Sequence, residues 1–289
     1  MKQRQTYFWM GALNEEDIHG LIQLSASVGW DYDEREISTA MSVGTVYGHK
    51  DEQGKIISSA AIIPYNQKLA SIGMVIVNHN YRGLGLGSDL TTSCIQSVAD
   101  HVTIMLIATE EGVPLYEKLG FHTVTYVHKF LCDKYVPLDR ENEDMEYEIR
   151  PFTETHLEQI RELDQKAFGA DRSVFLKSRL RQAKKSVVAR QKNGTCLGYG
   201  FSIEGPVNLI LGPIISTNYD VAYRILHELA NEHQGKLRID VPDGQETFMQ
   251  YLERVGFRKV SQPPVMIKNS NSLPERENTL YSISAQIFG

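Results

Sequence analysis

The hydrophobic pattern changes period along the chain, and the changes predict alternating strands and helices. Near-continuous apolar runs at residues 69–77 and 102–108 are typical of strands buried on both faces. Between them, residues 88–98 have the spacing of an amphipathic helix. Near the start, residues 14–17 offer an asparagine cap and an acidic first turn before apolar positions at helical spacing. The pattern therefore predicts an α/β (α+β) protein.

Further segments complete the first part of this layout. Residues 6–10 are predicted to form a first strand, and residues 33–41 a second short helix. Residues 45–49 and 56–63 predict a hairpin, because a turn cluster of Asp, Glu, Gln and Gly lies between them. We expect a mixed, mostly antiparallel sheet flanked by helices.

At 289 residues the chain is long for one such unit, and the pattern begins again in its second half. Residues 133–146 are rich in acidic residues and contain a proline, which favours an exposed linker. A strand is predicted at residues 147–152. A helix follows, with capping-box spacing from Thr155 to Glu158. We therefore expect a first domain at residues 1–132, a linker at 133–146 and a second domain at 147–289.

The two halves share short sequences in the same order. The sequence Tyr-Glu-Lys-Leu-Gly-Phe at residues 116–121 corresponds to Leu-Glu-Arg-Val-Gly-Phe at residues 252–257. The apolar strand at residues 72–76 likewise corresponds to residues 211–215. Two similar folds in tandem are the simplest interpretation.

Glycines separate the predicted strand at 69–77 from the helix that follows it. Residues 82–87 read Arg-Gly-Leu-Gly-Leu-Gly. Glycine lets the backbone turn tightly and lie against a ligand, and the first N–H groups of a helix attract anions. The spacing fits neither a dinucleotide-binding fingerprint nor a P-loop. The pattern indicates a pyrophosphate site, the alternative being a tight turn that binds nothing.

The motif Arg82-x-x-Gly85-x-Gly87 resembles the acyl-CoA pyrophosphate loop of the GNAT superfamily of N-acetyltransferases. The later segment Leu115-Tyr116-x-x-x-Gly120-Phe121 resembles the short helix and strand that close the acetyl-CoA site in that family. The whole layout is similar to bacterial two-domain proteins with an N-terminal GNAT domain and a divergent GNAT-like C-terminal domain. The resemblance implies two tandem GNAT-like domains and acetyl-CoA as acyl donor.

The resemblance also implies roles for individual residues. Backbone groups of one strand segment would contact pantetheine, and one N–H would stabilise the oxyanion; the segment is Met74, Val75, Ile76 and Val77. The loop that would hold the pyrophosphate comprises Arg82, Gly83, Leu84, Gly85, Leu86, Gly87 and Ser88. Tyr116 stands where many relatives place a general acid for the CoA thiolate, and a phenol with a pKa of about 10 suits that task. The alternative for Tyr116 is a packing role.

The base and the acceptor site stay open. Many relatives use a glutamate on the fourth strand, but residues 69–77 contain no carboxylate. Glu110, Glu111 and His79 are the candidates, each of which could equally be a solvated loop residue. Between the first two helices lie aromatic and acidic side chains that would suit a cationic amine, namely Trp30, Asp31 and Tyr32. The alternative is a plain loop that ends in a helix cap at Asp33.

The second copy lacks the features of the first. Opposite the glycine loop we align residues 221–226, which contain no glycine, and Leu252 replaces Tyr116. We therefore expect catalysis in the first domain only.

Composition excludes several classes of protein. The net charge is −6, so a nucleic-acid surface is not indicated, and we expect the basic cluster at residues 177–185 to be a solvated helix face. The three cysteines favour a reducing cytoplasm and give neither a disulfide framework nor a zinc pattern. No metal-ligand spacing, targeting segment or membrane span is recognised, so no metal and no membrane partner are expected.

These observations predict an acetyl-CoA-dependent N-acetyltransferase that transfers acetyl to a primary amine of a small molecule or peptide in a ternary complex. The alternative is a non-catalytic acyl-CoA-binding sensor or interaction module, which the missing strand carboxylate favours. A tRNA-dependent aminoacyl transferase is a weaker third reading, because no RNA surface is evident. The apolar tail at residues 280–288 either completes the second sheet or pairs with another chain, so both a monomer and a homodimer are open.

Overall fold

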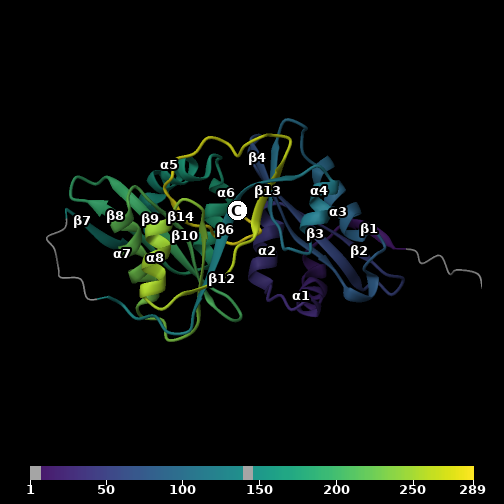
Figure 1. Ribbon diagram of the computed structural model, residues 1–289, viewed down its shortest axis with the longest axis horizontal. Coiled ribbons are helices and arrows are strands. Elements are labelled where there is room, and N and C mark those ends of the chain that lie inside the picture. The colour runs from purple at the N-terminus through teal and green to yellow at the C-terminus, as the bar shows by residue number, and fades with distance from the viewer. Residues whose placement is uncertain (1–7, 139–145) are drawn as a thin grey trace, which may run out of the picture.

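The computed structural model describes residues 8–138 and 146–289 (Figure 1). Its α-helices are α1 Ile18–Ser27, α2 Glu34–Val43, α3 Leu86–Gln96, α4 Val113–Lys118, α5 Leu157–Phe168, α6 Ser173–Gln182, α7 Tyr219–Ala230 and α8 Glu246–Arg254. The strands of the first half are β1 Trp9–Ala12, β2 Thr45–Lys50, β3 Ile56–Tyr65, β4 Leu69–Val77, β5 Thr103–Ile107 and β6 His122–Cys132. Those of the second half are β7 Tyr147–Pro151, β8 Ala183–Gln191, β9 Cys196–Glu204, β10 Leu209–Ser216, β11 Leu237–Pro242, β12 Arg258–Ser261, β13 Pro264–Lys268 and β14 Leu280–Ser282.

The strands form one continuous sheet that runs through both halves. Its order is β1-β2-β3-β4-β5-β13-β6-β11-β10-β9-β8-β7, with β12 paired to β6 and β14 paired to β10. Among the strand pairs of the described residues, β4 with β5 and β10 with β11 are parallel, and the others are antiparallel. The predicted mixed, mostly antiparallel architecture of two tandem units is confirmed.

The halves exchange strands at their junction. Strand β13 comes from the end of the chain, yet it pairs with β5 and with the first part of β6. The second part of β6 pairs instead with β11 and β12. Figure 1 shows the yellow β13 beside the blue strands of the first half. Each half therefore completes the sheet of the other, and no pattern in the sequence predicts this exchange of strands.

Capping side chains set several helix starts. Asp33 accepts a hydrogen bond from the Glu36 N–H at 2.8 Å, so α2 begins where the sequence predicts. The capping box proposed for Thr155 is wrong by two residues: the Thr153 N–H donates to Nδ1 of His156 at 2.9 Å, before α5. Within the predicted first strand, Thr6 and Tyr7 lie outside the described residues.

The domain limits stay a prediction, because the linker residues 139–145 lie outside the described part of the chain. The neighbouring residues that are described pack on the second half. The Val136 N–H donates to the Val255 carbonyl at 3.0 Å, and the Tyr135 ring stacks edge-on to Phe257.

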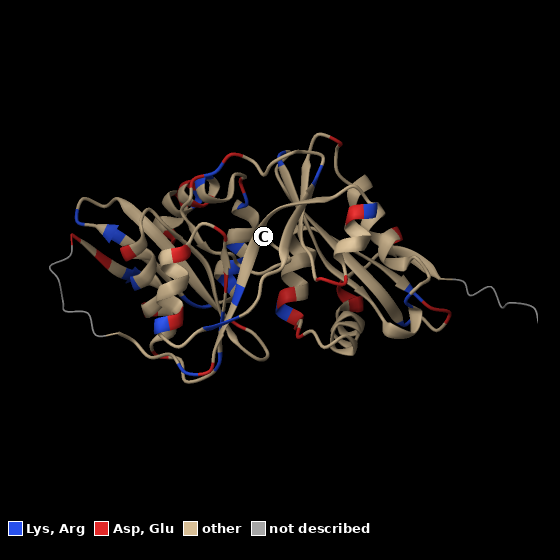
Figure 2. Cartoon of the chain, in the orientation of Figure 1, with Lys and Arg blue, Asp and Glu red and all other residues tan. Residues whose placement is uncertain are grey.

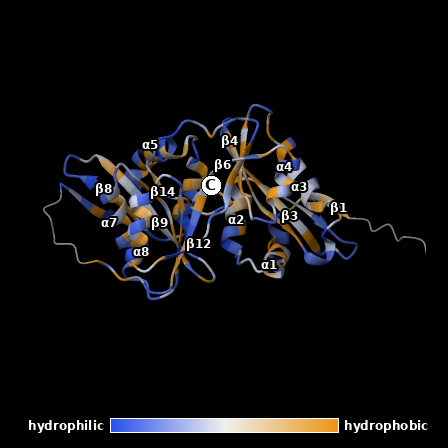
Figure 3. Ribbon diagram, in the orientation of Figure 1, coloured by the Kyte–Doolittle hydropathy of each residue, from blue (hydrophilic) through white to orange (hydrophobic). Residues whose placement is uncertain are grey.

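The hydrophobic core continues across the junction between the halves. Figure 3 shows hydrophobic residues concentrated on the strands and on the helix faces that cover them. Tyr65 of β3 packs against Phe168 of α5 with ring centroids 5.0 Å apart, and Phe175 packs against Phe288 at 4.6 Å. Because one apolar cluster contains residues of both halves, we expect the halves to unfold together.

The sequence predicts that the basic cluster at residues 177–185 is a solvated helix face, and this prediction is wrong for Arg179. Arg179 is completely buried, pairs with Glu36 of α2 and donates to Oγ of Ser284 at 2.8 Å. Arg181, on the same helix, is exposed. A buried guanidinium needs a carboxylate partner, and that partner comes from a distant part of the chain. Elsewhere acidic and basic residues are interspersed over both halves (Figure 2).

Candidate active site

The two central strands of the first half separate partway along their length. Parallel pairing of β4 with β5 ends at Ile72 and Leu106. Beyond that point β4 continues to Val77 on its pairing with β3 alone. Backbone groups on the β5-facing edge of β4 are thereby released from the sheet and can bind an extended ligand.

A β-bulge marks the point of separation. Residues Met74 and Val75 of β4 stand opposite the single residue Ala60 of β3, as the register shift shows. Met74 has a φ of 51°, a left-handed conformation that non-glycine residues seldom adopt. The Ser59 hydroxyl donates to the Met74 carbonyl at 2.8 Å and helps to hold this conformation. The bulge turns the strand out of register just where the cavity begins.

The glycine loop lies at the start of α3. Gly83 and Gly85 have φ values of 79° and 81°, and a Cβ on either residue would meet nothing within 4 Å. The loop therefore needs glycine for its backbone conformation rather than for packing. Gly85 occupies the N-cap position and supplies no side-chain hydrogen bond. The first N–H groups of α3 are left for another acceptor, which is the arrangement that binds phosphate.

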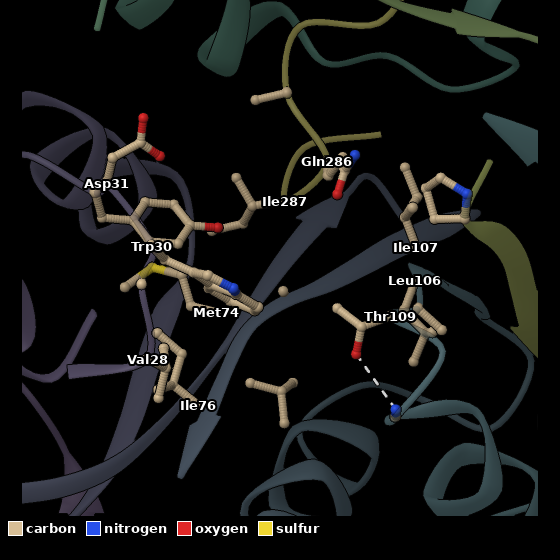
Figure 4. Close-up of a pocket in the computed structure, with 18 of the residues that line it drawn as sticks. Val28, Trp30, Asp31, Met74, Ile76, Leu106, Ile107, Thr109, Gln286 and Ile287 are labelled. Atoms are coloured by element: carbon tan, nitrogen blue, oxygen red, sulfur yellow. Dashed lines mark hydrogen bonds between the residues drawn. The ribbon is translucent and has the colours of Figure 1, made fainter. Parts of the chain in front are cut away.

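A cavity of about 1050 Å³ joins these features. Of the residues proposed from the sequence, Leu84 lies outside its lining and is 56% exposed. The cavity brings the others together, namely Trp30, Asp31, Tyr32, Met74, Val75, Ile76, Val77, Arg82, Gly83, Gly85, Leu86, Gly87, Ser88, Glu110, Glu111 and Tyr116. Figure 4 shows Trp30 beside Met74, with Leu106 and Thr109 across the cavity.

Tyr116 lies in the cavity wall on α4 and is 8% exposed. Burial, reinforced by the nearby Cys94, raises the pKa of its phenol to about 12. The ring of Phe121 packs against it edge-on at 6.0 Å. A phenol that stays protonated in a ligand cavity can donate a proton and is a poor base.

The candidate bases lie at the rim. Glu110 and Glu111 are both exposed, and Glu111 forms a long ion pair with Arg82 at 3.5 Å. His79 lines the same cavity at the end of β4. Glu110 forms no side-chain hydrogen bond or ion pair with any described residue.

The proposed acceptor residues lie between α1 and α2. The Tyr32 N–H donates to the Ser25 hydroxyl at 3.2 Å, and the Trp30 and Tyr32 rings are 6.1 Å apart. Burial raises the pKa of the Tyr32 phenol, and Glu36 raises it further. Asp33 caps α2, as the alternative predicts, while Asp31 is exposed beside the cavity, so the acceptor role of this loop stays a prediction.

Sequence reasoning missed the residues that β6 and the second half contribute to the cavity wall. Lys129 of β6, Arg238 of β11 and the β9–β10 loop all line the cavity. So does the tail, through Gln286 and Ile287 (Figure 4). A Cβ on Gly73 would come within 2.6 Å of Ile287 Cγ1, so the tail packs directly on β4. The only signal was the tail's apolar composition.

The second half lacks both the glycine loop and the open strand edge of this site among the described residues. Residues 221–226, aligned from the sequence with the glycine loop, lie inside α7, whose start is capped by Asn218 through the Val221 N–H at 3.0 Å. Parallel pairing of β10 with β11 also stops early, but β14 pairs with β10 there, and the Ile283 N–H donates to the Asp240 carbonyl. The chain's own tail therefore occupies the gap between β10 and β11 and completes the second sheet.

Two kinds of feature, metal-ligand clusters and membrane-spanning helices, are absent from the described residues. No group of three or more His, Cys, Asp or Glu side chains there is placed to hold a metal ion. Within residues 8–138 and 146–289, no helix has the length and apolar character that a bilayer crossing requires.

Comparison with known proteins agrees with this geometry. Two family models described as acetyltransferase (GNAT) domain match residues 32–131 and 160–282. The uncharacterized N-acetyltransferase YitH of Bacillus subtilis (strain 168) is 36% identical over 278 residues, which cover 96% of this chain and 97% of that protein.

Solved structures show the same fold over the whole chain. A provisionally assigned acetyltransferase from Pyrococcus horikoshii superposes with a TM-score of 0.81 at 20% identity, covering 100% of this chain and 99% of that one. A tandem GNAT protein from the clavulanic acid biosynthesis pathway gives a TM-score of 0.66 at 13% identity, covering 92% and 100%. At these identities the structures support the tandem fold alone.

Proposed function

Because the chain belongs to the GNAT superfamily of N-acetyltransferases, we propose that it transfers acetyl from acetyl-CoA directly to a primary amine of a small molecule or peptide. The family uses acetyl-CoA as its acyl donor. One observation supports this use here above all: the separated edge of β4 and the uncapped start of α3 open into one cavity.

The residues present fit the donor in three respects. The loop from Arg82 to Ser88 offers backbone N–H groups and a guanidinium to a pyrophosphate. The free edge of Met74–Val77 offers peptide groups to pantetheine. A cavity of about 1050 Å³ is large enough for the chain of the donor and an acceptor.

In the proposed reaction the neutral amine attacks the thioester carbonyl carbon. A backbone N–H of Met74–Val77 stabilises the oxyanion, since its donor is fixed before charge develops. The C–S bond then breaks, and the Tyr116 phenol gives its proton to the leaving thiolate. The proton lost by the amine passes to Glu110 through solvent, because Glu110 is the rim carboxylate without an ion pair to a described residue.

Thermal unfolding with and without acetyl-CoA tests donor binding. At 100 times its dissociation constant the ligand should stabilise the protein by about 2.7 kcal/mol. Gly85→Glu places a carboxylate in the pyrophosphate loop and should abolish this shift. Gly54→Glu is the matched control, because Gly54 has a similar φ of 79°, open surroundings and a place in the β2–β3 turn.

Thiol release from acetyl-CoA in the presence of an amine panel tests catalysis. We expect turnover with at least one primary amine and loss of turnover in Gly85→Glu. A shift without turnover for any amine would favour a non-catalytic acyl-CoA sensor. No shift in the wild-type protein would refute the proposal.

A further inference from the structure

Two basic side chains, one from the end of the first half and one from the second half, face the acceptor end of the cavity. Lys129 of β6 is the register partner of Asp240 of β11, and Arg238 lies two residues before Asp240 on the same strand. Cross-strand partners and alternate residues share one face of a sheet. Lys129 and Arg238 therefore stand side by side on that face, and both line the cavity.

One carboxylate, Asp240, lies beside these two cations and pairs with Arg238 alone. Asp240 is almost fully buried and accepts from Arg238 Nε at 2.8 Å and from Gln286 Nε2 at 3.3 Å. Among the described residues, only Nε of Arg238 has a hydrogen-bond partner, so its two terminal amino groups are available to a ligand. Lys129 is half-buried and forms no ion pair with any described residue. The pair thus brings one more positive charge into the cavity than Asp240 neutralises.

The acidic side chains around them are engaged elsewhere. Glu36 pairs with Arg179, and Glu204 of β9 pairs with Lys184. Asp33 accepts from the first turn of α2. Asp31 forms no ion pair with a described residue, but it lies on the first-half wall and acts electrostatically on both Lys129 and Arg238. The acceptor end therefore carries an excess of positive charge on one wall and a carboxylate on the other.

The electrostatic surroundings of Lys129 favour the binding of an anion. Burial lowers the pKa of its ammonium group, and Arg238 lowers it further, while Asp240 and Asp31 act in the opposite direction. A half-buried cation beside a guanidinium is costly unless an anion joins them. Such a pair is chemically suited to a planar carboxylate or a phosphate.

We propose that Lys129 and Arg238 bind an oxyanion group, a carboxylate or a phosphate, carried by the amine acceptor. The acceptor is then an amino acid or an aminoalkyl phosphate rather than a polyamine or a plain amine. The CoA pyrophosphate is a separate ligand group, because its loop precedes α3 whereas β6 and β11 lie beyond β13 in the sheet. This inference rests on the proposed acetyl transfer and adds the class of acceptor.

The test compares amines in matched pairs: an amino acid with its carboxamide, and an aminoalkyl phosphate with the corresponding amino alcohol. The readout is kcat/KM for thiol release from acetyl-CoA. We expect the wild-type protein to favour the anionic member of at least one pair by about 10-fold or more, as charge-assisted hydrogen bonds provide. The preferred pair distinguishes carboxylate from phosphate.

Variants then assign the preference to these residues. Lys129→Met and Arg238→Gln should each lower kcat/KM for the anionic amine by about 10- to 100-fold and leave its neutral partner within about twofold. Lys192→Met, in the exposed β8–β9 turn, is the matched control and should change neither. Stabilisation by acetyl-CoA should persist in all three variants, which separates this result from failure of donor binding.

Two outcomes would overturn the inference. One is equal use of both members of every pair, or an equal loss for both in Lys129→Met, while turnover itself is retained. The other is donor binding without turnover, combined with no calorimetric binding of any anionic amine to the CoA-loaded protein. A wild-type protein that fails to bind acetyl-CoA refutes the proposed function instead.

Discussion

Removing the buried guanidinium of Arg179 should strongly destabilise the junction between the halves. Arg179 is fully buried, and its partner Glu36 is 14% exposed. Its Nε and Nη groups also donate to the Ser284 hydroxyl at 2.8 Å, to Gln182 at 2.9 Å and to the Ser284 carbonyl at 3.2 Å. In Arg179→Met all of these acceptors lose their donor.

The magnitude follows from what the variant leaves behind. Removing one partner of a buried ion pair costs about 3–5 kcal/mol, because the remaining charge stays desolvated. Glu36 keeps some contact with solvent, so we expect about 3 kcal/mol. At roughly 2–4 °C per kcal/mol for large domains, the melting temperature should fall by about 6–12 °C.

Equilibrium unfolding in urea, followed by fluorescence and circular dichroism, measures the effect. Arg181→Met is the matched control on the same helix, since Arg181 is exposed, and it should stay within about 0.5 kcal/mol of wild type. Arg179→Met/Glu36→Leu should recover part of the loss, because the unpaired carboxylate is then absent. A loss below about 1 kcal/mol in Arg179→Met would refute the reasoning.

Three further predictions concern the site and the core. Tyr116→Phe should lower kcat by about 100-fold or more if the phenol is the general acid. Burial raises the pKa of the Tyr116 phenol to about 12, so the folded protein keeps this proton from pH 7 to pH 10. The ratio of wild-type to variant kcat should therefore stay constant over that range, and a ratio that falls to one by pH 10 would contradict the assignment. Gly73→Ala should cost about 1–3 kcal/mol of unfolding free energy by displacing Ile287, whose Cα lies 2.8 Å from the added Cβ, and should raise the acceptor KM; unchanged stability in urea would argue against this contact. In the folded protein at pH 8 a thiol reagent should react with none of the three buried cysteines, Cys94, Cys132 and Cys196, and in denaturant it should react with all three. Burial raises the pKa of each thiol, to about 12 for Cys94. A thiol titration that detects a fast-reacting group in the folded state would contradict this prediction.

The donor side of the site could be predicted from the sequence because its determinants are local. A strand, a glycine turn and a helix start are adjacent in the chain, and Leu69–Val77 forms β4 with the bounds that its apolar run predicts. The loop at Gly83 and Gly85 needs only backbone freedom, which the residue type reports directly. Capping at Asp33 is equally local, since its side chain reaches just three residues along the chain.

The cavity wall at Lys129 and Arg238 could not be predicted in this way, because its residues meet only through long-range packing. Lys129 and Arg238 read as ordinary strand residues until β6 pairs with β11. Arg179 fits a solvated helix pattern, and only the approach of α2 supplies the carboxylate that lets it be buried.

The sequence by itself determined the elements, their order, the tandem plan and the glycine loop, since each depends on residues a few positions apart. The tertiary structure alone decided the exchange of β6 and β13, the burial of the tail against Gly73, and the second-half wall of the cavity. Strand exchange depends on which free edge a strand meets, and hydrophobic period carries no information about the partner. Local structure could be predicted because it follows from short-range backbone preference, whereas strand partners depend on long-range competition for the same sheet edge.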